Sequence, residues 1–103
     1  MSRGYNIDLS NTQGIIIAMG EIEEFVRILK TNLILTMVDE LIARERFGFS
    51  FKIVNIQART AIANFNLENF LTLLNKRISL EMAIERSKKN LDLLSYQLIY
   101  LRK

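Results

Sequence analysis

Apolar side chains in the first half of the chain recur at spacings of four and three, which is typical of one face of an α-helix. The stripe begins with Ile15, Met19, Ile22, Val26, Leu29 and Leu33, and it then shifts to Ile34, Val38, Leu41 and Ile42. Ser10 or Thr12 is expected to cap this helix, because each hydroxyl can accept a hydrogen bond from a free backbone N–H. The pattern predicts a helix over residues 13–46, preceded by a polar, flexible N-terminal arm over 1–12.

The segment around Gly48 has two interpretations. Phe47, Phe49, Phe51 and Ile53 alternate with small or polar residues, which is the period of a β-strand. The other interpretation begins a helix near Ser50 and follows a stripe of apolar residues at spacings of three and four. We favour the helix, because its stripe is longer and a lone strand has no partner elsewhere in this chain. Gly48 is the expected end of the first helix, so a turn is predicted at about 47–50.

The remaining residues, about 51–103, are expected to form one helix or two. One apolar stripe consists of Leu67, Leu71, Leu74 and Ile78. A second has the spacing of a heptad seam in a coiled coil and consists of Leu80, Ile84, Ser87, Leu91, Leu94, Leu98 and Leu101. A slip in register near Ile78 separates them. We therefore expect the first stripe to serve the domain's own core, and the Leu80–Leu101 seam to pack against a partner or a second copy.

These patterns predict an all-α fold of two or three helices, arranged as an antiparallel helical hairpin or small bundle that self-associates. The helical domain is expected to span residues 13–103. Half of the 103 residues are apolar, and a hairpin has little interior, so a subunit interface is expected. No apolar run reaches the length of roughly 18–20 residues that a membrane span needs, and no secretory signal is visible. We expect a cytoplasmic location, or export without a cleaved signal.

Missing residue types exclude much chemistry. The chain has no Cys and no His, so thiolate nucleophiles, disulfides, histidine triads and His-based metal sites are ruled out. Its four glycines are isolated, so no glycine-rich phosphate loop is present. The expected protein is therefore not an enzyme and uses no cofactor and no metal.

The candidate site residues belong to two surfaces. An interface with a second copy or another helical protein is expected at apolar positions, namely Phe47, Phe49, Phe51, Leu80, Ile84, Leu91, Leu94, Leu98 and Leu101. A less favoured nucleic-acid contact would use the basic side chains Lys76, Arg86, Lys88 and Lys89. This alternative rests on charge, because residues 47–103 carry nine basic against four acidic side chains in a chain of net charge +3.

Helical spacing of four residues predicts four ion pairs: Glu23 with Arg27, Glu40 with Arg44, Arg77 with Glu81, and Glu85 with Lys89.

The whole layout, two helical halves about the central Phe47-Gly48-Phe49, resembles the small WXG100 proteins and helical accessory proteins of type VII secretion. The Trp of their turn is absent here, and the chain ends in YLRK. The resemblance implies a helical hairpin in a secretion accessory role. The residues themselves favour a non-catalytic module for protein–protein interaction or assembly.

Overall fold

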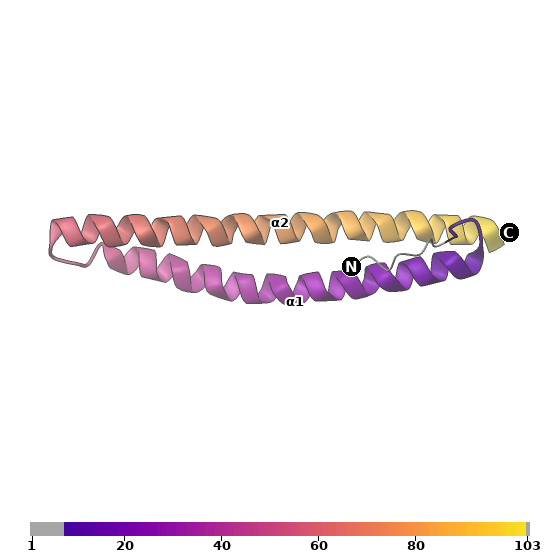
Figure 1. Ribbon diagram of the computed structural model, residues 1–103, viewed down its shortest axis with the longest axis horizontal. Helices are drawn as coiled ribbons and strands as arrows, with labels where there is room; N and C mark the ends of the chain where they lie inside the picture. The colour runs from indigo at the N-terminus through magenta and orange to yellow at the C-terminus, as the bar shows by residue number, and fades with distance from the viewer. Residues whose placement is uncertain (1–7, 103) are drawn as a thin grey trace. The chain divides into compact units, whose positions relative to one another are not determined.

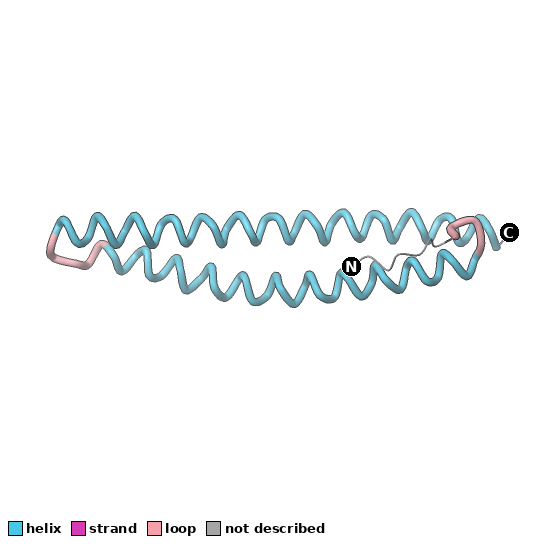
Figure 2. Tube along the Cα trace, in the orientation of Figure 1, coloured by secondary structure: helices cyan, strands magenta, loops and turns pink. Residues whose placement is uncertain are grey.

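The computed structural model describes residues 8–102, and they form two helices. Helix α1 spans Thr12–Ser50 and helix α2 spans Ile56–Arg102, joined by a turn over residues 51–55 (Figures 1 and 2). The all-α hairpin is confirmed. No strand occurs among residues 8–102, so the strand interpretation of 47–53 is wrong there. Beyond the turn there is one helix rather than two, and no third helix lies in this range; self-association stays a prediction.

Helix α1 begins with an asparagine cap. The Asn11 side-chain oxygen accepts a hydrogen bond from the backbone N–H of Gly14 at 2.8 Å, which is the geometry of an N-cap. The predicted caps, Ser10 and Thr12, are therefore wrong. Ser10 instead donates from its hydroxyl and its backbone N–H to the Asp8 carboxylate, and these bonds lower the pKa of Asp8. The rest of the predicted flexible arm, residues 1–7, lies outside the described residues.

The turn lies at 51–55 rather than at 47–50, because α1 continues through Gly48. Its last turn is closed by backbone bonds, such as that from the Lys52 N–H to the Phe49 carbonyl at 3.0 Å. Asn55 then caps α2, accepting a hydrogen bond from the Ala58 N–H at 2.9 Å. A glycine inside a helix is tolerated at about 1 kcal/mol. Gly48 therefore does not have to end the helix when a stronger start signal follows at Asn55.

The chain divides into two compact units. The first, here called the terminal unit, contains residues up to Leu29 and from Ala83 onward; the second, the turn unit, is Lys30–Met82. Each unit pairs a segment of α1 with a segment of α2. In the terminal unit the buried side chains include Ile15, Val26, Leu29, Ile84 and Ser87. The α1 stripe predicted from Ile15 to Leu33 is thus confirmed, since all its members are buried or half-buried.

In the turn unit the inward face of α1 is made of small and polar residues. Thr36 and Ala43 are 1% and 2% exposed, and Ser50 at the end of the helix is 2% exposed. Together with the half-buried Glu40 and Phe47, they continue the spacing of four and three set by Leu29 and Leu33, without a break. We call these inward positions, and those of α2 that face them, the seam. The predicted shift of the stripe to Ile34, Val38, Leu41 and Ile42 is therefore wrong, because all four are exposed.

Helix α2 likewise keeps a single seam. One set of buried and half-buried positions recurs at four and three from Ala63 to Leu101, with no slip near Ile78. In the turn unit this set is Ala63, Asn66, Phe70, Leu73, Arg77 and Leu80, and Leu67 and Leu74 beside it are half-buried as well. Leu71 and Ile78, which were predicted to serve the core, are 44% and 43% exposed. The register slip seen in the sequence is therefore a change between two stripes, only one of which faces α1.

Alanine substitution is expected to have opposite effects on stability at the two glycines in the first half of α1. A Cβ on Gly14 would lie 1.7 Å from the Asp8 carbonyl oxygen, so Gly14→Ala must displace the turn that precedes the helix. A Cβ on Gly20 would meet nothing within 4 Å. Gly20→Ala should therefore raise the free energy of unfolding by about 0.5–1 kcal/mol, because alanine has the higher helix propensity. The urea midpoints of the two variants should shift in opposite directions. A Gly14→Ala variant more stable than the wild type would contradict the expected clash with Asp8.

Candidate functional site

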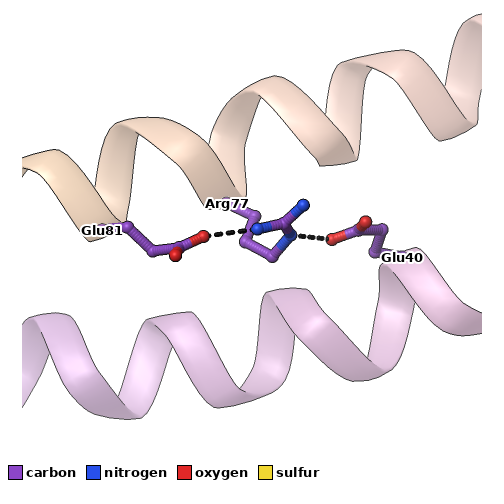
Figure 3. Close-up of polar contacts among 3 residues, drawn as sticks. All are labelled: Glu40, Arg77 and Glu81. Atoms are coloured by element: carbon purple, nitrogen blue, oxygen red, sulfur yellow. Dashed lines mark hydrogen bonds and ion pairs between the residues drawn. The ribbon is translucent and has the colours of Figure 1, made fainter.

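A cluster of charged side chains lies in the seam of the turn unit. Arg77 on α2 donates one hydrogen bond to Glu40 on α1 and another to Glu81 on its own helix (Figure 3). The side chains of Arg77 and Glu40 are only 28% and 17% exposed. The two carboxylates raise the pKa of Arg77, Glu40 having the larger effect. The predicted Arg77–Glu81 pair is confirmed, whereas Glu40 pairs with Arg77 rather than with Arg44 as predicted.

This cluster serves pairing rather than chemistry. Arg77 already holds both carboxylates, and a guanidinium stays protonated at any relevant pH. A charged pair at seam positions fixes which residues lie opposite one another, because any sliding of the helices would leave buried charges unpaired. We therefore expect Glu40 and Arg77 to favour one register of α1 against α2 in the turn unit.

The two helices are also tied together beside the turn. The Asn66 amide of α2 donates to the Ser50 hydroxyl at 2.7 Å and to the Arg46 carbonyl at 3.2 Å. The second of these bonds adds a link to a carbonyl near the end of α1. The buried Ser50 is thus fully bonded, since its hydroxyl also donates to the Arg46 carbonyl. These bonds account for the polar residues at this end of the seam.

The predicted phenylalanine patch is partly exposed. Phe47 is half-buried, and its ring packs edge-to-face against Phe51 with centroids 5.2 Å apart. Phe49 and Phe51 are 61% and 56% exposed. The Lys52 ammonium lies 4.6 Å from the Phe49 ring centroid, a cation–π contact that covers part of one ring. Two of the three predicted interface phenylalanines therefore have surface available for a partner.

One side of the turn unit, next to the seam, is polar. A hollow on this side is lined by Asp39 and Arg46 of α1 and by Asn69 of α2. In each helix these residues directly precede a seam position, as do Asn32 and Lys76, and all five are exposed. Apolar residues also lie on this side: Ile42 lines the same hollow, and Phe49, Ile53 and Ile62 line another near the turn. We call Asn32, Asp39, Arg46, Asn69 and Lys76 the polar flank.

The opposite side of the turn unit is apolar. A hollow there is lined by Met37, Leu41 and Arg44 of α1 together with Glu40 and Arg77 of the seam. On both helices most positions on this side of the seam carry large apolar residues, with the charged Arg44 and Glu81 as exceptions. We call this set the apolar flank: Ile34, Met37 and Leu41 of α1, and Leu67, Leu71, Leu74 and Ile78 of α2. Leu67 and Leu74 are half-buried and the other five are 43–63% exposed.

The leucines predicted to meet a second copy lie inside the hairpin. Ile84 is buried, and Leu80, Leu91, Leu94, Leu98 and Leu101 are half-buried at seam positions. Their contact with a second copy stays a prediction. The apolar flank escaped the sequence analysis, although the spacing of Leu67, Leu71, Leu74 and Ile78 was visible. Spacing alone does not say which of two parallel stripes faces the other helix.

The four basic residues predicted to contact nucleic acid, Lys76, Arg86, Lys88 and Lys89, are all exposed. Lys76 belongs to the turn unit and the other three to the terminal unit. Nucleic-acid binding stays a prediction. Within the described part of the chain no group of three or more acidic side chains is placed to hold a metal ion. No helix there is both long and apolar enough to cross a membrane.

Comparison with protein families, with curated proteins and with solved structures found no match to this chain. The secretion accessory role implied by the WXG100-like layout stays a prediction. The geometry of the chain itself is therefore the basis for a functional proposal.

Proposed function

We propose that this protein is a non-catalytic assembly module that binds other helices through its apolar surfaces. The observation that supports the proposal is the distribution of side chains in the turn unit. Small and polar residues, Thr36, Ala43 and Ser50, occupy the most deeply buried seam positions of α1, while many large apolar residues are exposed. A monomeric hairpin would be more stable with the large apolar residues in the seam and the small and polar residues at the surface. The outward apolar residues are therefore best explained by a partner that covers them.

The exposed residues of α1 form a broad surface rather than scattered positions. Ile34 and Leu35 are 63% and 60% exposed, and Val38, Leu41 and Ile42 continue the surface along the helix. A helix that is apolar all round is normally buried on all sides. Fully burying one side chain of this kind contributes about 1.5–3 kcal/mol, so three or four of them could hold a complex together.

Site-specific photo-crosslinking tests this function. A photoreactive amino acid at Leu35, in the exposed apolar surface of α1, should give a discrete cross-linked product in native cells. Its partner is then identified by mass spectrometry as another helical chain or as this chain itself. The matched control places the same group at Asn75, an exposed polar position on α2. Equal and diffuse labelling from both positions would contradict an assembly function.

A further inference from the structure

We propose that the apolar flank of the turn unit binds the same flank of a second copy, so that two hairpins form a four-helix bundle. This inference rests on the proposed function and names the partner. It differs from the interface expected at the Leu80–Leu101 seam, because those side chains are buried or half-buried within the single chain.

The first argument is the width of the apolar face. A pair of helices needs apolar residues only along the seam, two positions in every seven. Helices of a larger bundle also need the adjacent position on one side, three in seven. Met37 on α1, and Leu67 and Leu74 on α2, occupy that adjacent position, and Arg44 and Glu81 occupy it seven residues further along each helix. Part of the turn unit therefore has the pattern of a bundle with more than two helices, and one hairpin supplies only two.

The second argument is that the flank matches itself. Ile34, Met37 and Leu41 on α1 follow the same alternation of three and four as Leu71, Leu74 and Ile78 on α2. A twofold interface uses one surface patch on both subunits, which must be complementary to itself. These six positions carry no charged side chain, so a second copy brings no like charges together among them. A second copy thus presents an apolar face of the same composition and spacing.

The third argument is exposure. Five of the seven residues of the apolar flank are 43–63% exposed, and Leu67 and Leu74 are half-buried. Burying large apolar side chains of this kind favours association, because it removes apolar surface from water. A twofold contact would cover this set on each of the two copies, so the flank supplies apolar surface for association from both sides.

The polar flank sets the size of the assembly. Asp39, Arg46 and Lys76 are charged and exposed on the side opposite the apolar flank. Covering them would desolvate charges without supplying partners for them, which is unfavourable. The charged side chains of the polar flank therefore make it the less favourable side to cover, and we expect a closed pair of hairpins joined by their apolar flanks rather than an open chain of them.

The test is the solution mass of the full chain, measured by light scattering across a range of protein concentrations. The wild-type chain should have twice its monomer mass. Leu71→Glu combined with Ile78→Glu places two carboxylates on the flank, and we expect the mass to fall by half and the dimer Kd to rise roughly 100-fold or more. The matched control, Asn69→Glu with Lys76→Glu on the polar flank, should remain a dimer. Circular dichroism checks that every variant keeps its helices.

Each other outcome has a definite meaning. A wild-type chain that stays monomeric at all concentrations overturns the second-copy proposal, and cross-linking at Leu35 then decides the assembly function separately. A helical Leu71→Glu/Ile78→Glu variant that stays dimeric also overturns it. If Leu93→Glu with Ile99→Glu, on the exposed surface of the terminal unit, abolishes that dimer, the second copy docks there and only the choice of flank is wrong.

Discussion

Ile15→Ala is expected to lower the free energy of unfolding by about 2–5 kcal/mol, the largest effect of any single truncation in this chain. Ile15 is fully buried, at 0% exposure, in the terminal unit. The truncation removes apolar atoms from the core and leaves a cavity that the surrounding helices fill only in part. At a urea dependence of about 1–3 kcal/mol per molar, the unfolding midpoint should fall by about 1 M or more.

The neighbouring isoleucine provides the control. Ile16 has the same side chain on the same helix turn but is 43% exposed. Ile16→Ala should therefore change the free energy of unfolding by less than about 1 kcal/mol. Both variants must be compared at one protein concentration, because association makes apparent stability depend on concentration. Equal effects at the two positions would mean that Ile15 does not lie in the core.

Arg77→Ala is expected to lower the free energy of unfolding by about 1–3 kcal/mol. The substitution leaves Glu40, whose side chain is 17% exposed, beside the seam without its cation. The loss should exceed that of an ordinary ion pair, because a poorly hydrated carboxylate without a partner carries an unfavourable desolvation energy. Glu40→Ala together with Arg77→Ala should be less destabilising than the sum of the single changes, and urea unfolding of all four chains gives the coupling.

An exposed ion pair on one helix is the control for Arg77. Arg27 and Glu24 lie three residues apart on α1, and their side chains are 73% and 51% exposed. Arg27→Ala should change stability by less than about 1 kcal/mol, because water screens exposed pairs. If Arg77→Ala were equally mild, the Glu40–Arg77 pair would not set the register of the hairpin.

The secondary structure was largely predictable because it depends on local chemistry. Apolar periodicity and the absence of proline indicate long helices, and nothing in the chain forces a break within α2. The errors lie at the ends. Gly48 looked like a helix end, yet α1 runs to Ser50, and the start of α2 is fixed by Asn55. Where a helix ends depends on the side chains that pack around the competing end signals. The spacing of apolar residues does not reveal that packing.

The candidate site was harder to predict. The sequence analysis assigned the large apolar residues to the core and the Leu80–Leu101 seam to a partner. In the turn unit the structure places smaller residues, Thr36 and Ala43, at the inward positions of α1 and leaves Leu71 and Ile78 exposed. The Glu40–Arg77 pair joins residues 37 apart, so neither residue reveals its partner locally. The sequence therefore revealed only in part which positions of α2 face α1.

The sequence by itself determined that this protein is helical, that it has no histidine and no cysteine, and that it has more apolar stripes than a hairpin can bury. Only the tertiary structure decided which stripe lies inside. Both stripes have the same period, so helix geometry cannot choose between them. The choice follows from interactions across the turn unit, namely small side chains in the seam, the Arg77 cluster and the bonds of Asn66. These place Leu71 and Ile78 on the outside, where the proposed second copy would cover them.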